Sequence, residues 1–387
     1  MWLGQLGAAT GMHADMVARS WLAWELTGSS SAVAGVNVAR AIPMLLFGLF
    51  GGVAADRFDR RKLLVVIQAW SLGMFAVMAV LIFTHVIEMW HVYAIAFGTG
   101  CGFALNQPVR TSIVPSLVDR KDMLNAVTLN SIAMNSSRLI GPAIIATVIQ
   151  VTSTGAAYVW AAGIYGVVIL TTLQIHLPET VGRLKGSALR QLAEGFAYMK
   201  ENRLVLALVL LGLAPLSIGF SHQTLLPQLV DERLGQEPGM YGYIISVGAI
   251  GGLTGALFVA SRQTVSHKGY WMIAASLFYG FALLGFASVA ATKILLLAFP
   301  LIIVVGASQN IFRAMNTTTL METTPDQLRG RVMSVMLLDT ALAPVAGLAA
   351  GAAADKWGVD AGYLLLGSAC VVVVALMLLF YPKVRNL

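Results

Sequence analysis

Long runs of apolar residues are the feature that most constrains this chain. Of its 387 residues, 58% are hydrophobic and only 11% are charged, whereas roughly 25% of residues are charged in an ordinary soluble domain. A helix needs about 20 apolar residues to cross the hydrocarbon core of a bilayer. The sequence therefore predicts an all-α polytopic membrane protein.

We expect twelve transmembrane helices. The first is the least apolar, because it contains His13, Asp15 and Arg19. Met1 almost coincides with the start of this helix, which leaves no basic cytoplasmic tail before it. We therefore expect that a short tail precedes Met1. The predicted spans are residues 2–26, 31–55, 63–84, 89–109, 123–151, 156–177, 203–230, 239–261, 269–290, 294–316, 329–354 and 359–381.

Lys and Arg are distributed unevenly between the loops. Seventeen of the 25 lie in loops on one predicted side of the membrane, three lie on the other side, and five lie inside or at the ends of spans. Basic residues mark cytoplasmic loops, so we expect both termini in the cytoplasm. The same rule accounts for the net charge of +7 without a nucleic-acid partner.

The longest polar segment divides the predicted spans six and six. Within it, Leu189, Leu192, Phe196 and Met199 recur at helical spacing, which predicts an amphipathic helix along the inner membrane face. The expected organisation is an N-terminal six-helix half (1–177), a cytoplasmic linker with that helix (178–202) and a C-terminal six-helix half (203–387).

A weak internal repeat supports the two halves. Shifting the sequence by about 205 positions aligns 112–127 with 318–332 and Arg57 with Arg262. Two duplicated six-span halves are typical of secondary transporters.

The stretch GGVAADRFDRRK (51–62) puts six charges between two apolar runs. It resembles the conserved loop between spans 2 and 3 of the major facilitator superfamily, which has a glycine, an Asp-Arg pair and a basic run. Asp59 stands where that superfamily often has glycine, a departure typical of a bacterial efflux branch that includes enterobactin exporters and macrolide-efflux proteins. Residues 20–36 and 129–146 also resemble that branch.

The resemblance implies the major facilitator fold and a role for this loop as a conformational latch. Glycines such as Gly52 allow close helix packing, and the basic residues can compensate Asp56 at the helix end. The alternative is a set of solvated charges that only set topology; we favour the latch. Its candidate residues are Gly52, Asp56, Arg57, Arg60, Arg61 and, in the second half, Arg262.

Ionisable groups inside spans are costly and usually functional. Arg19 follows Asp15 by four residues, so both lie on one helix face and can pair, and Arg40 is a rival partner. Asp15 is the first candidate to carry a proton, and Asp339 is the second; the alternative for Asp15 is a structural ion pair that never titrates.

Polar residues on other spans complete the predicted transport path. Arg138, Gly141 and Pro142 in RLIGP resemble the superfamily's antiporter motif, although its later glycines are replaced by alanine. The candidate cavity residues are Asn106, Gln107, His222, Gln223, Gln309, Asn310 and Arg313.

These features predict a proton-coupled exporter of amphipathic small molecules such as drugs or siderophores, in a bacterial plasma membrane. We find no enzymatic motif and expect neither a metal nor a cofactor, and a monomer suffices. One alternative is an importer of a small organic acid or sugar, which Arg138 and Arg313 keep open. A non-transporting membrane scaffold is a more distant one.

Overall fold

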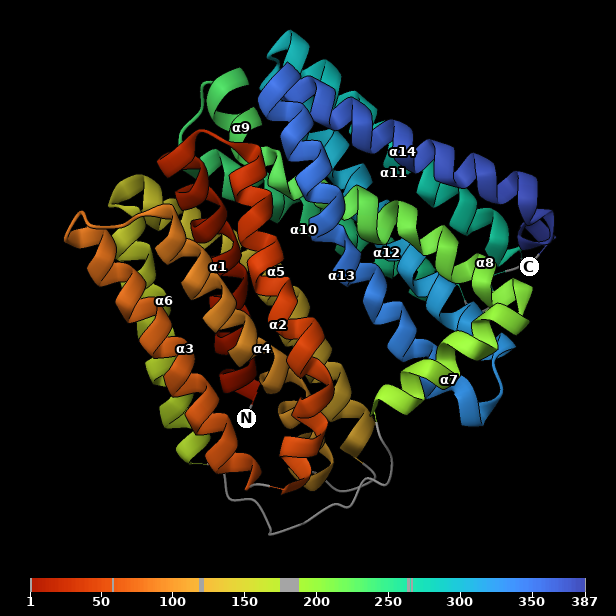
Figure 1. The fold of residues 1–387 in the computed structure, drawn as a ribbon, viewed down its shortest axis with the longest axis horizontal. Coiled ribbons are helices and arrows are strands. Elements are labelled where there is room, and N and C mark those ends of the chain that lie inside the picture. The colour runs from red at the N-terminus through yellow and green to blue at the C-terminus, as the bar shows by residue number, and fades with distance from the viewer. Residues whose placement is uncertain are drawn as a thin grey trace. The chain divides into compact units, whose positions relative to one another are not determined.

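The computed structural model describes residues 2–57, 59–117, 122–174, 188–262, 265 and 267–386. These residues form helices joined by short connections, and no strand occurs among them (Figure 1). They divide into two compact units. Unit 1 comprises Met1–Gly28, Gly35–Gly186 and Glu237–Ser246, and unit 2 comprises Ser29–Ala34, Ser187–Gln236 and Val247–Leu387.

Six long helices build most of unit 1. In it α1 packs against α5 and α6, and α3 packs against α4 and α6. The helices are α1 (Trp2–Thr27), α2 (Ser30–Arg57), α3 (Arg60–Phe83), α4 (Met89–Leu117), α5 (Met123–Val151) and α6 (Thr154–Leu173).

Unit 2 is organised around α11, which packs against α12 and α14, and around α13, which packs against α14 and α7. Its helices are α7 (Ala188–Glu201), α8 (Arg203–Gly212), α9 (Leu226–Gln228), α10 (Pro238–Ala260), α11 (Lys268–Thr292), α12 (Leu295–Thr323), α13 (Asp326–Trp357) and α14 (Val359–Phe380). The first residues of α10 belong to unit 1.

The span predicted at 203–230 is helical but not a uniform α-helix. After α8 the chain forms π-helical turns at Leu213–Ile218 and Leu229–Arg233, with a 3-10 segment at Gly219–Thr224 between them. Pro215 and Pro227 lie in this stretch, and a proline removes a backbone donor from the helical ladder. The interruption therefore lies in the stretch where these two prolines remove backbone donors.

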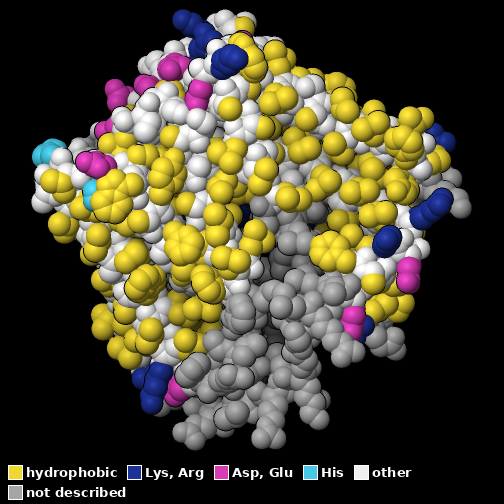
Figure 2. Space-filling model, in the orientation of Figure 1, with side chains coloured by type: hydrophobic (Ala, Val, Ile, Leu, Met, Phe, Trp, Pro, Cys, Tyr) yellow, Lys and Arg dark blue, Asp and Glu magenta, His cyan; other side chains and the backbone are white. Residues whose placement is uncertain are grey.

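The helices carry apolar side chains on their outer surfaces. Val66, Leu170, Phe278 and Leu296 are each more than 60% exposed, and hydrophobic side chains are spread widely over the described part of the face in Figure 2. Counting α8 to Arg233 as one, the described chain has twelve helical segments of spanning length. Nine of them also meet an apolar-composition standard for crossing a membrane. The chain thus fits a lipid environment.

Two polar features explain details of the predicted loops. Asp59 caps α3, because its carboxylate accepts a hydrogen bond from the Lys62 backbone N–H at 2.9 Å.

Helix α7 lies within the segment predicted as a linker, with Met199 buried and Phe196 46% exposed. Its Glu194 lies 3.0 Å from Arg331 of α13, which ties α7 to unit 2.

Candidate functional site

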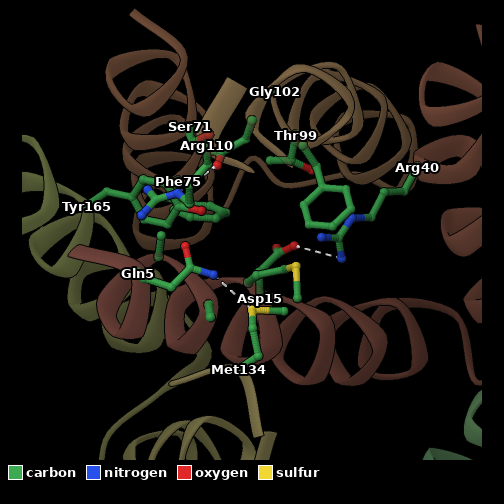
Figure 3. A pocket seen from close by; sticks show the side chains of 15 residues that line it. Gln5, Asp15, Arg40, Ser71, Phe75, Thr99, Gly102, Arg110, Met134 and Tyr165 are labelled. Atoms are coloured by element: carbon green, nitrogen blue, oxygen red, sulfur yellow. Dashed lines mark hydrogen bonds and ion pairs between the residues drawn. The ribbon is translucent and has the colours of Figure 1, made fainter. Parts of the chain in front are cut away.

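A cavity inside unit 1 collects side chains from all six of its long helices (Figure 3). Polar groups and apolar groups share its wall, as expected of a site for an amphipathic molecule. The lining residues are Gln5, Ala8, Ala9, Met12, Asp15, Arg40, Ser71, Phe75, Thr99, Gly102, Phe103, Asn106, Arg110, Met134 and Tyr165.

Asp15 is the centre of a buried ion cluster on the cavity wall. Its Oδ2 lies 2.6 Å from Nη1 of Arg19 and 3.6 Å from Nη1 of Arg40. Asp15 and Arg19 are 3% and 1% exposed, and Arg40 is 14% exposed. The sequence predicted the first pair from its four-residue spacing, and the structure brings Arg40 of α2 to the same carboxylate.

The position of Arg40 depends on a close approach between α2 and α4. A Cβ added at Gly100 would lie 2.4 Å from the Arg40 carbonyl oxygen, a distance that no real side chain tolerates. The Arg40 guanidinium also lies over the Phe103 ring, with 5.4 Å between its carbon and the ring centroid. Glycine at position 100 therefore lets α4 pack closely against α2, with Phe103 of α4 under the Arg40 guanidinium.

Arg110 was not among the candidates predicted from sequence, although it lines the cavity. It is 5% exposed, and its Nε donates to Oδ1 of Asn106 at 3.2 Å. Its Nη2 has no hydrogen-bond partner among the described residues. An arginine at the end of a predicted span, four residues after Asn106, was the available signal.

Aromatic rings form the apolar part of the wall. Phe75 and Tyr165 pack edge to face, with their ring centroids 5.3 Å apart. Tyr165 comes from α6 and Phe75 from α3, so the cavity wall depends on the contact between those two helices.

The predicted antiporter-like motif lies at the contact between α5 and α1. A Cβ at Gly141 would lie 3.0 Å from the Thr10 carbonyl oxygen, so glycine permits close packing there. A Cβ at Gly242 of α10 would lie 2.5 Å from the Pro142 carbonyl oxygen. Arg138 lies on the same helix and makes interactions of its own, and it does not line the cavity.

The structure describes only part of the predicted latch. The surroundings of Gly52 and the side chains of Asp56 and Arg57 lie outside what the structure describes. Arg61 donates to the Leu173 carbonyl oxygen of α6, and Arg60 has interactions of its own.

In unit 2 the remaining latch candidate, Arg262, lies over two aromatic rings of its own unit. Its guanidinium carbon is 4.8 Å from the Phe258 ring centroid and 5.6 Å from the Trp271 ring centroid.

The cavity candidates of unit 2 are spread over two segments. His222 is buried, with Nδ1 2.9 Å from the Gly219 carbonyl oxygen and 3.2 Å from the Tyr279 hydroxyl. Gln309 is buried, and its Nε2 has no partner among the described residues. Asn310 donates to the Gly306 carbonyl oxygen at 3.2 Å.

The structure describes the side chains of two of the four remaining predicted residues. Gln223 is half-buried, and Arg313 is exposed and makes interactions of its own. The side chains of Gln107 and Asp339 lie outside the described residues. Within the described ranges, no three His, Cys, Asp or Glu side chains come together as a metal site.

Comparison with known proteins extends over the whole chain. Residues 1–387 match a family model described as "transmembrane secretion effector". The staphyloferrin A transporter of Staphylococcus aureus is 26% identical over 100% of this chain and 93% of that protein. Macrolide efflux protein A of Streptococcus pyogenes is 23% identical over 100% of this chain and 96% of that protein.

A solved structure shares the fold. A variant of the nucleoside transporter NupG superposes with a TM-score of 0.79, covering 98% of this chain and 99% of that one. The two sequences are only 14% identical, so this likeness concerns the arrangement of helices and not the substrate.

Proposed function

Since the chain belongs to the transmembrane secretion effector family of the major facilitator superfamily, we propose that it exports amphipathic small molecules by alternating access and uses protons for coupling. Membership confirms the predicted class: the chain is a secondary transporter with the major facilitator fold, not an enzyme. Its export direction and substrate type are supported by relatives named for a siderophore and a macrolide.

The observation that carries the proposal is the buried cluster around Asp15. A carboxylate 3% exposed inside a cavity is costly unless it is paired, and membrane proteins keep such groups chiefly where ions or substrates move. Protonation of Asp15 would release its hold on Arg19 and Arg40. A change of charge at this point therefore alters the contacts between α1 and α2.

The same cluster favours a second candidate, import of a small organic acid together with a proton. With Asp15 ionised, Arg19, Arg40 and Arg110 leave two uncompensated positive charges near the cavity, and protonation leaves three. A carried anion and the proton would then bind together, which is the requirement for symport. Antiport instead needs a substrate that competes with the proton.

The cellular placement follows the bacterial relatives and the loop charges. We place the transporter in the plasma membrane of a bacterium, with both termini in the cytoplasm. The division into two six-helix halves, the latch and the antiporter-like motif remain parts of this proposal, and a single copy suffices for transport.

Retention of two fluorescent dyes in cells tests the proposal. Rhodamine 123 is a lipophilic cation, and carboxyfluorescein is an anion that enters cells as its diacetate ester. We expect cells that express the chain to retain less of at least one dye than cells without it, and a protonophore to remove the difference. If cells with and without the chain retained the same amount of each dye, export of amphipathic molecules would be overturned.

Variants of α1 test the role of Asp15. Asp15→Asn removes the titratable group, whereas Asp15→Glu keeps one. The matched control is Glu25→Gln, because Glu25 is an exposed carboxylate of the same helix that accepts from Thr154 at 3.2 Å. At equal protein levels, Asp15→Asn should abolish export while Glu25→Gln preserves it. Export that survives Asp15→Asn leaves the carboxylate a structural role only.

The direction of proton movement separates the two candidates. Proteoliposomes that contain a pH-sensitive dye report whether protons move with or against the transported molecule. Movement in opposite directions supports export by antiport, and movement in the same direction supports the second candidate.

A further inference from the structure

We propose that the cavity of unit 1 binds an organic anion, with Arg110 holding its carboxylate and Arg40 adding positive charge to the wall. This inference rests on the proposed transport function and names the substrate class of the same cavity. Because an anion that binds together with the proton meets the requirement for symport, the inference favours the second of the two candidate functions.

The charge balance of the cavity is the first argument. Two arginines and one carboxylate line it, and Arg19 behind Asp15 adds a third positive charge. The lining residues that α3, α5 and α6 contribute carry no charge. The other carboxylates that the structure describes in unit 1 are all exposed and cannot neutralise it: Glu25, Asp59, Glu88, Asp122 and Glu237.

The unused hydrogen-bonding capacity of the arginines is the second argument. Nη2 of Arg110 and Nε of Arg40 are buried and have no partner among the described residues. Buried polar groups in folded proteins are nearly always hydrogen-bonded, and an unmade bond to a charged group is expensive. An oxyanion bound at Arg110 would satisfy its Nη2, because a guanidinium presents a planar fork that matches a carboxylate.

The geometry of the wall is the third argument. In Figure 3, Arg110 and Arg40 lie on either side of Asp15, and both point into the cavity. Phe75 and Tyr165 form an apolar surface beside Arg110. An anion with an apolar or aromatic body fits this combination, whereas a lipophilic cation would face a net repulsion.

Binding of two dyes with the same ring system tests the inference. Carboxyfluorescein and rhodamine 123 share the xanthene core but carry opposite charge, and fluorescence anisotropy with the purified full-length protein reports the affinity of each. We expect carboxyfluorescein to bind at least tenfold more tightly than rhodamine 123. Equal affinity, or tighter binding of rhodamine 123, would overturn the inference.

Variants of Arg110 show whether the site is the one proposed. Arg110→Gln should weaken carboxyfluorescein binding roughly tenfold to a hundredfold, and Arg110→Lys should keep the preference for the anion. Arg233→Gln is the control, because Arg233 pairs with Asp360 of its own unit at 2.8 Å and 35% exposure. Unchanged binding by Arg110→Gln would refute the assignment.

Thermal stability distinguishes a binding residue from a structural one. Because Nη2 of Arg110 is buried and has no partner in the part of the chain that the structure describes, Arg110→Gln should leave the melting temperature unchanged or raise it, whereas a structural arginine would lower it. The transport and binding results can also fail separately. Anion binding without transport would contradict the proposed function alone, and transport of rhodamine 123 without anion binding would contradict this inference alone.

Discussion

The ion cluster around Asp15 predicts which of two substitutions lowers the stability of the protein more. Asp15→Asn leaves Arg19 and Arg40 buried without a counter-charge, and they then repel each other. Arg19→Gln leaves Asp15 with Arg40, whose Nη1 is 3.6 Å from the carboxylate. The aspartate substitution should therefore be the more destabilising of the two.

The magnitude follows from the burial of the pair. Removing one member of a buried ion pair destabilises a protein by about 3–5 kcal/mol, and Asp15 and Arg19 are 3% and 1% exposed. We expect Asp15→Asn near the top of that range and Arg19→Gln near or below its lower end. The double variant should cost less than the sum by roughly 1–3 kcal/mol, because it removes both charges.

Unfolding of the purified protein in mixed micelles, followed by circular dichroism as the denaturing detergent is increased, measures these free energies. All four proteins of the cycle are compared at one pH and one salt concentration. Two results would refute the reasoning: an Arg19→Gln variant less stable than Asp15→Asn, or strictly additive effects in the double variant.

Three further predictions concern packing and surface charge. Gly100→Ala should destabilise the protein by about 1–3 kcal/mol, because the added Cβ would meet the backbone of α2 at 2.4 Å. Gly73→Ala should instead stabilise it by about 0.5–1 kcal/mol, since nothing lies within 4 Å of the added carbon. The same detergent titration measures both, and a Gly100→Ala variant as stable as Gly73→Ala would contradict the close approach. Glu322 pairs with Lys268 at 2.5 Å and is 55% exposed. Because exposed ion pairs contribute little, Glu322→Gln should change stability by under about 1 kcal/mol. A larger loss that does not depend on salt would contradict this.

Sequence reasoning reached the fold class because the signal is local. The length of an apolar run decides whether a helix can cross a bilayer, and the four-residue spacing of Asp15 and Arg19 places both on one face whatever surrounds the helix. The resemblance of residues 51–62 to a transporter loop then indicated the family, and the match over residues 1–387 confirms it.

Sequence reasoning was less successful for the site. It chose polar residues by the span on which they lie, which does not say which side of the helix meets a cavity. Arg138 and Arg110 both lie inside apolar helices, yet only Arg110 lines the cavity. Gln309 and His222 were proposed with equal weight, and the structure gives His222 hydrogen-bond partners while leaving Nε2 of Gln309 without one among the described residues.

The sequence by itself determined that this chain is a helical membrane transporter and that Asp15 has a partner one turn away. Only the tertiary structure decided which cations share a cavity with that carboxylate. Arg40 reaches it because Gly100 lets α2 and α4 approach closely, and Arg110 faces the same space from α4. The physical reason is that hydropathy and helical spacing act within one helix, whereas the charge of a cavity is the sum over side chains that six helices bring together.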